Sequence, residues 1–270
     1  MSAIFLAIGI LAVLGLASGL ILAVASAVMA VPRDEKTEQL REVLPGANCG
    51  ACGYSGCDGY AEAMAHDGAK VGLCSPGGND VAEKTAEILG VKSDGVETLT
   101  AFVRCGGCEE FTTRKLEYRG LRSCAAANQF YGGNWSCSYG CLGYGDCAGV
   151  CEYGAITIEN GLAKIDPALC RGCTKCVAAC PKSLIMMNPG SARGVVRCMN
   201  QDKGAVTRKA CGVGCIGCMK CTKVCEHDAI HVTNFLAKID TDECVGCGAC
   251  ADHCPVGCIN IFGHVILIPH

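Results

Sequence analysis

The chain lacks the sequence signatures of proteins that make or break bonds in a bound substrate. It contains no P-loop for nucleotide phosphates and no Ser–His–Asp order for nucleophilic catalysis. Residues 143–148, GYGDCA, formally match the dinucleotide fingerprint, but they lie inside a cysteine run without the strand, long helix and acidic residue that the motif needs. The net charge of −3 gives no indication of nucleic-acid binding. These absences argue against substrate chemistry, and we predict no catalytic residue.

Charge is also missing from residues 3–31, a run of 29 residues. About 20 helical residues cross a bilayer core, so we predict a transmembrane anchor over residues 1–32. The run is longer than the roughly 7–15 apolar residues of a signal peptide, and no Lys or Arg precedes it. Arg33, Lys36 and Arg41 follow it, which predicts a single-pass protein of the inner membrane with its C-terminal part in the cytoplasm.

Cysteine, in contrast, is abundant, at 26 of 270 residues. Residues 170–181, CRGCTKCVAACP, have the spacing of a bacterial ferredoxin, in which three thiolates hold one [4Fe-4S] cube and the fourth binds a neighbouring cube. Disulfides would leave many of these closely spaced thiols unpaired, and zinc sites do not usually have three close cysteines followed by Cys-Pro. The run therefore predicts a pair of iron–sulfur clusters.

The same run returns at residues 244–255, 74 residues later, as part of a longer repeat. Without a gap, this offset also aligns five further pairs of cysteines and the segment LAKID at 162–166 and 236–240. We predict two tandem 2[4Fe-4S] ferredoxin modules, residues 137–197 and 198–270, built of short strands and helices. With a helical domain before them, the predicted fold class is α+β.

Aligning the two modules predicts the ligands of four cubes. In the second module the sets are Cys215, Cys218, Cys221 and Cys254, and Cys225, Cys244, Cys247 and Cys250. In the first module one set is Cys151, Cys170, Cys173 and Cys176. The other lacks one thiolate, because Tyr144 stands where the second module has Cys218, and we predict that Cys137 replaces it beside Cys141, Cys147 and Cys180.

A fifth site precedes the modules. Cys49, Cys52, Cys57 and Cys74 lie in a predicted helical domain, residues 33–91, followed by a linker and connecting segment at 92–136. Four thiolates form one closed site, for which we favour a [4Fe-4S] cluster, with zinc as the alternative.

Six cysteines remain, namely Cys105, Cys108, Cys124, Cys198, Cys211 and Cys258. We predict a sixth [4Fe-4S] cluster held by Cys105, Cys124, Cys198 and Cys211, with Cys108 as the rival of Cys105 and a few buried free thiols as the alternative. Cys258 aligns with Leu184, an apolar position, and is predicted to be a buried free thiol.

The order of an apolar helix, a C-x2-C-x4-C-x16-C domain and ferredoxin repeats containing C-x3-C-L-G-x-G-D-C resembles the B subunit of the Rnf complex in its long form. The resemblance implies an ion-translocating ferredoxin:NAD oxidoreductase. In it this chain would be the electron-input subunit, which accepts electrons from soluble reduced ferredoxin and passes them to flavin and iron–sulfur partners. It implies no nicotinamide or flavin site on this chain. The alternatives are a membrane-anchored polyferredoxin of another redox complex, such as a hydrogenase, and a nonenzymatic metal-binding or redox-sensing protein.

The charges around the two ferredoxin runs differ. Arg171, Lys175 and Lys182 surround the first, where the second has apolar residues. Because bacterial ferredoxins are generally acidic, we expect ferredoxin to dock beside the first module, with a merely solvated basic face as the alternative.

Overall fold

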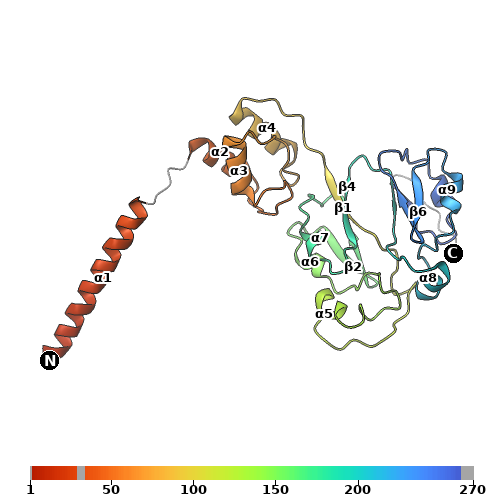
Figure 1. The fold of residues 1–270 in the computed structure, drawn as a ribbon, viewed down its shortest axis with the longest axis horizontal. Coiled ribbons are helices and arrows are strands. Elements are labelled where there is room, and N and C mark those ends of the chain that lie inside the picture. Colours follow the sequence, from red (N-terminus) through yellow and green to blue (C-terminus); the bar gives the residue numbers. More distant parts are fainter. Residues whose placement is uncertain (1, 29–33, 263–270) are drawn as a thin grey trace.

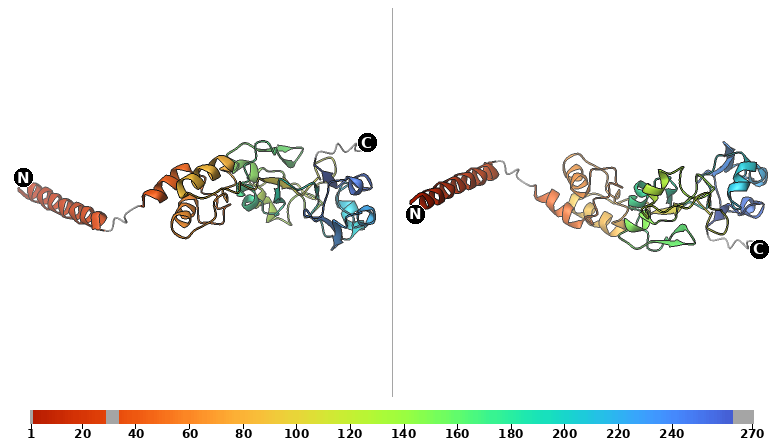
Figure 2. Two further views of the ribbon diagram at one scale, coloured as in Figure 1. Left: turned by 90° about the horizontal axis from the view of Figure 1, so that it is seen from above. Right: turned by 90° about the horizontal axis from the view of Figure 1, so that it is seen from below.

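The computed structural model describes residues 2–28 and 34–262, and after the first helix it arranges the chain as a succession of small units (Figure 1). A helical unit, residues 35–89, comes first, and the two cysteine repeats follow it. Figure 2 views this arrangement from above and below, and in both views the helical unit and the second repeat lie at opposite ends of the cysteine-rich part. Residues 263–270 of the predicted second module lie outside the described residues.

The first helix, α1, runs over Ser2–Val28 in the segment predicted to be a membrane anchor. Within the described ranges, no helix is both long enough and apolar enough to cross a membrane. The transmembrane part of the predicted fold class is therefore corrected, and the remainder of the anchor, residue 1 and residues 29–32, lies outside the described residues.

A small helical domain contains α2 (Glu35–Val43), α3 (Cys57–His66) and α4 (Gly78–Leu89). Its core is formed by apolar side chains spaced three or four residues apart, including Leu40, Tyr60 and Met64. The last helix ends at Gly90, whose positive φ of 70° lets its N–H reach back to the carbonyl of Ala86. These contacts hold the loops that carry the first four cysteines.

Each repeat contains a hairpin with the same register. In the first repeat β2 (Ile156–Glu159) pairs with β3 (Leu162–Ile165), and in the second β6 (Ile230–Thr233) pairs with β7 (Leu236–Ile239). The inward residues are buried in both hairpins. The helices that accompany them are short: α5 (Cys124–Asn128), α6 (Asp146–Gly149), α7 (Lys175–Ala179), α8 (Gly204–Ala210), α9 (Lys220–Val224) and α10 (Ala249–Asp252).

The last strand of each repeat takes its partner from the segment before that repeat. β4 (Ile185–Pro189) pairs with β1 (Leu99–Val103), which comes from the predicted linker. β8 (Ile259–Ile261) pairs with β5 (Gly194–Val196), which the sequence assigned to the end of the first module. A lone closing strand would leave its backbone groups without partners, and the preceding segment supplies them. Each structural unit therefore begins before the predicted module boundary.

The cysteine loop of the first repeat requires glycine where it crosses the hairpin. Gly143 has a φ of 73°, and a Cβ there would lie 2.4 Å from the carbonyl oxygen of Gly161. Gly154 also has a positive φ, 61°, but a Cβ added to it would meet open space. An alanine at position 154 would therefore suffer backbone strain alone, whereas an alanine at position 143 would suffer both strain and steric overlap.

Replacing Gly154 by Ala should cost about 1 kcal/mol of unfolding free energy, because an L-residue is strained at positive φ. Gly143→Ala should cost about 1–3 kcal/mol more, because the hairpin backbone must also move. Urea unfolding of the two variants beside the unchanged protein measures this difference. Equal midpoints for the two variants would show that the close approach at Gly143 contributes nothing.

Candidate functional site

The cysteines line cavities in groups of four. All 26 are free of disulfides. Among the described residues, no three His, Cys, Asp or Glu side chains form a group that could hold a single metal ion. Instead five apolar cavities each have at least four cysteines in their walls. Four soft thiolates around one apolar space fit a [4Fe-4S] cube.

Three of the five cavities contain the cysteine sets expected from the alignment. They are Cys151, Cys170, Cys173 and Cys176; Cys215, Cys218, Cys221 and Cys254; and Cys225, Cys244, Cys247 and Cys250. In each set three cysteines come from one run, and the fourth comes from the other run of the same repeat. The folded hairpin between the runs brings the fourth cysteine to its place.

The first-repeat cavity with Cys141, Cys147 and Cys180 differs from expectation, because its fourth thiol is Cys124 instead of Cys137. Asp146 explains the difference: its carboxylate accepts hydrogen bonds from Ser123 Oγ and from the backbone N–H groups of Cys124 and Ala125, each 2.9 Å long. These bonds fasten the start of α5 to α6.

The second repeat has Lys220 where the first has Asp146, so its own equivalent of Cys124 cannot be held in this way. That equivalent is Cys198, which lines a different cavity. The Asp146–Lys220 difference was visible in the alignment of the repeats, and it is the signal that sequence reasoning missed.

The fifth cavity brings together Cys105, Cys137, Cys198 and Cys211. The predicted sixth set is thus altered at one position, with Cys137 in the place of Cys124, and Cys105 lines the cavity where Cys108 does not. Gly107 lets the 105–107 turn approach closely, since a Cβ there would lie 3.0 Å from Cys211 Sγ.

Asn200 connects two thiols of this fifth cavity. Its side chain is buried, its Nδ2 donates to Cys137 Sγ at 3.6 Å, and its backbone N–H donates to Cys198 Sγ at 3.4 Å. Its Oδ1 accepts from Thr207 Oγ1 at 3.2 Å and from the Asp202 N–H at 2.7 Å. The amide is therefore satisfied on both sides, as a buried polar group must be.

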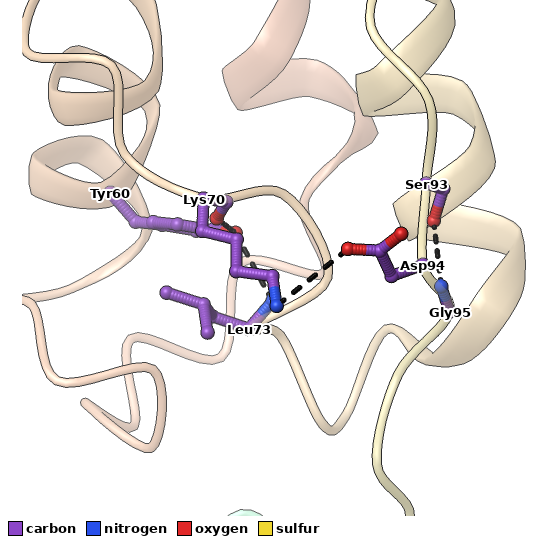
Figure 3. A network of polar contacts seen from close by, with 6 residues as sticks. All are labelled: Tyr60, Lys70, Leu73, Ser93, Asp94 and Gly95. Carbon is purple, nitrogen blue, oxygen red and sulfur yellow. Dashed lines mark hydrogen bonds and ion pairs between the residues drawn. The ribbon is translucent and has the colours of Figure 1, made fainter.

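The cysteines of the helical domain also form one group. Cys49, Cys52 and Cys57 all lie near enough to Cys74 to interact with it electrostatically. Asn48 Oδ1 accepts the N–H of Cys57 at 2.8 Å, which fixes the start of α3. The buried Tyr60 fastens the loop that leads to Cys74: its hydroxyl donates to the carbonyl of Lys70 at 2.8 Å and accepts the N–H of Leu73 at 3.3 Å (Figure 3).

Comparison with known families agrees with this arrangement. A family model described as a putative Fe-S cluster matches residues 44–76, one described as a 4Fe-4S binding domain matches residues 162–185, and a 4Fe-4S dicluster domain matches residues 212–261.

Similar proteins match nearly the whole of this chain. The chain is 43% identical to the B subunit of the Na(+)-translocating ferredoxin:NAD(+) oxidoreductase complex of Acetobacterium woodii, over 96% of this chain and 78% of that protein. It is 40% identical to the B subunit of the ion-translocating oxidoreductase complex of Methanosarcina acetivorans, over 94% and 97%. It is also 40% identical to the B subunit of the proton-translocating ferredoxin:NAD(+) oxidoreductase complex of Clostridium ljungdahlii, over 96% and 93%. The chain belongs to the B-subunit family of ion-translocating (Rnf) oxidoreductase complexes.

In this member of the B-subunit family, burial raises the pKa of several thiols in the cavity walls above the usual value of cysteine. Burial raises the pKa of Cys105 and of Cys147 to about 12, and that of Cys176 to about 11. Since metals bind the thiolate, cluster assembly at these sites must release protons. Cys215 and Cys254 differ, because a hydrogen bond with Cys258 lowers their pKa to about 6 and about 5.

The six cysteine groups follow one another in a single row. The group of the helical domain meets the first repeat where Cys49 interacts with Cys173. The two groups of the first repeat share one hydrophobic core. The Cys141 N–H then donates to Cys105 Sγ at 3.5 Å, and the Cys215 N–H to Cys198 Sγ at 3.3 Å. Cys221 and Cys250 connect the last two groups. The row runs unbranched from the helical domain to the second repeat.

The assignment of Cys124 and Cys137 to different cavities predicts non-additive iron losses. A Cys124→Ser, Cys141→Ser double variant should lose about four iron atoms, because both residues serve one cube. A Cys124→Ser, Cys137→Ser double variant should lose about eight, because they serve two. Iron and sulfide analysis of the anaerobic proteins measures this. If the second double variant lost only four, the two cysteines would belong to one cluster.

The Tyr60 hydroxyl should stabilise the loop before Cys74. Tyr60→Phe removes two partly buried hydrogen bonds, to the carbonyl of Lys70 and from the N–H of Leu73, which should cost about 0.5–1.5 kcal/mol of unfolding free energy. Thermal unfolding and limited proteolysis of residues 70–74 report this loss. Tyr54→Phe is the matched control. The Tyr54 ring lies against the Tyr60 ring, with centroids 5.2 Å apart, and the substitution removes only the Tyr54 hydroxyl. A Tyr60→Phe variant with an unchanged unfolding temperature and unchanged proteolysis would contradict the role of the hydroxyl.

Proposed function

We propose that this chain is an iron–sulfur electron-transfer subunit that accepts electrons from reduced ferredoxin. It would relay them to other subunits of an ion-translocating ferredoxin:NAD oxidoreductase. The observation that carries the proposal is the unbranched row of six four-cysteine groups. The names of the similar proteins support it, since two of them are ferredoxin:NAD(+) oxidoreductase subunits.

Six [4Fe-4S] clusters would occupy the groups, and each would take up and release one electron at a time. The chain's own residues would do three things for them: cysteine thiolates hold the iron, the apolar walls exclude water, and backbone N–H groups donate to ligand sulfur. The last contact recurs, as when the Ala101 N–H donates to Cys170 Sγ and the Ala237 N–H to Cys215 Sγ, at 3.4 Å in both cases. Such bonds and burial tune cluster potentials.

The proposed location is at a membrane-bound complex, with the clusters on its cytoplasmic side. The similar proteins are named as parts of ion-translocating complexes, and ion translocation requires a membrane. The reducing cytoplasm suits a protein whose 26 cysteines are all free.

The predicted docking surface of the first repeat is engaged in contacts within the chain. Lys175 Nζ forms an ion pair with Glu152 at 2.5 Å, and Lys182 Nζ donates to the Ser138 carbonyl at 2.6 Å. The carbonyl of Arg171 accepts from Ser75 Oγ of the helical domain at 3.5 Å. This segment therefore packs against the helical domain.

The second repeat offers a more open surface. Cys218 and Cys247 are the two exposed cysteines of the chain. Lys220 and Lys223 are exposed on α9 beside Cys218, and Met219, between Cys218 and Lys220, is half exposed. A cluster ligand at the surface, an apolar contact and a basic rim suit an acidic electron donor, because charge complementarity steers encounter and short distance favours transfer. We therefore propose that ferredoxin docks on the second repeat, beside Cys218.

Changing Lys220 and Lys223 together to Glu should slow cluster reduction by reduced ferredoxin about tenfold or more at low salt, with a smaller difference at high salt. The measurement is stopped-flow bleaching of cluster absorbance under anaerobic conditions. The control changes Lys84 and Lys92 of the helical domain and linker to Glu, which alters net charge equally away from Cys218 and should leave the rate unchanged. Equal rates for both variants would refute the docking surface. If ferredoxin did not reduce the unchanged protein, the proposed function itself would fail.

A further inference from the structure

Cys258 is a departure from the symmetry of the two repeats. The 74-residue offset places it opposite Leu184, and both side chains are buried, 3% and 1% exposed. The backbone at the two positions makes the same contact: the Arg104 N–H donates to the Leu184 carbonyl at 2.8 Å, and the Arg197 N–H donates to the Cys258 carbonyl at 2.7 Å. The two sites therefore differ in the side chain and not in the fold.

Both side chains line equivalent cavities. Leu184 lines the cavity of Cys124, Cys141, Cys147 and Cys180, and Cys258 lines that of Cys215, Cys218, Cys221 and Cys254. The Sγ of Cys258 lies 3.7 Å from the Sγ of Cys254 and also hydrogen-bonds the side chain of Cys215. A thiol can donate a hydrogen bond to a neighbouring sulfur, whereas the leucine side chain can donate none.

We propose that Cys258 is a positioning residue whose S–H group hydrogen-bonds the ligand sulfurs of Cys254 and Cys215. It would make the cluster held there easier to reduce than its counterpart in the first repeat. The proposal rests on the ligand sets of the proposed function. One-electron reduction adds one negative charge to the cluster and its thiolates, and a donor directed at those sulfurs stabilises that charge. The proton stays on Cys258, and no bond is made or broken.

The consequence for the row is a difference between two otherwise equivalent positions. The cluster beside Cys258 lies in the repeat that carries the exposed Cys218, whereas the cluster beside Leu184 lies deeper in the row. A more easily reduced cluster at the site with the exposed ligand Cys218 would retain an electron received from an external donor. The repeat thus supplies two corresponding sites, one with a thiol donor beside its ligands and one with a leucine in that place.

The test uses the full chain with clusters assembled, and it combines iron analysis with a redox titration followed by electron paramagnetic resonance. Cys258→Leu, which copies the first repeat, should keep all its iron. It should shift the reduction equilibrium of one cluster about tenfold towards the oxidised form, or about 59 mV for a one-electron couple. Cys258→Ser keeps a donor and should shift it less. The reciprocal change, Leu184→Cys, should move one first-repeat cluster in the opposite direction.

Three outcomes would overturn the proposal. Unchanged potentials in a Cys258→Leu variant with full iron content would exclude the hydrogen bond as a determinant. Loss of about four iron atoms from Cys258→Ser would make Cys258 a ligand. If the leucine proved too large and iron was lost, Cys258→Ala would decide, because it removes the donor without adding bulk, and unchanged potentials there would refute the proposal. Cys221→Ser separately tests the ligand set. It should abolish the resonance of the cluster whose potential Cys258→Leu shifts, and retention of that resonance would refute the ligand assignment of this site.

Discussion

Coordination of iron by buried thiolates is the constraint on which the rest of this structure depends. In the hydrophobic clusters of the two repeats, cysteines lie beside apolar residues of the short strands, such as Leu162 and Leu236. Cores of this size cannot offset the conformational entropy of ordering so many loops. Metal binding must therefore contribute much of the folding free energy, as in other minimal metal-binding domains.

The extent to which sequence could predict the structure follows from this constraint. Ligand spacing within a run is a local property, so the three cavities with unbroken ferredoxin runs contain the expected cysteines. The positions of Cys124 and Cys137 depend on Asp146, whose three hydrogen bonds join segments more than twenty residues apart in sequence, and spacing alone does not encode them. The partners of β4 and β8 were likewise missed, because strand pairing depends on which segment lies nearest in space. The predicted membrane anchor rested on the length of an uncharged run and on the placement of the basic residues around it, and among the described residues no helix is long and apolar enough to support it.

The two repeats keep the same backbone, and they differ at the residues that surround the clusters. Tyr144 packs against Tyr118, with ring centroids 5.7 Å apart, where the second repeat has the exposed Cys218. Asp146 and Leu184 of the first repeat are replaced by Lys220 and Cys258 in the second. The alanine at the position of Asn200, Ala126, has no side-chain group that could donate a hydrogen bond to cysteine. A duplicated scaffold thus carries one shielded repeat and one open repeat.

The unbranched row has a consequence for how the molecule would conduct. Sites joined in series offer no bypass, so the slowest hop limits the throughput between the point of electron entry and the point of exit, and an empty site between them interrupts it. One cluster on this path therefore cannot take over the function of another. The close spacing enforced at each junction, such as the backbone contact between Cys141 and Cys105, is what keeps every step of such a circuit short.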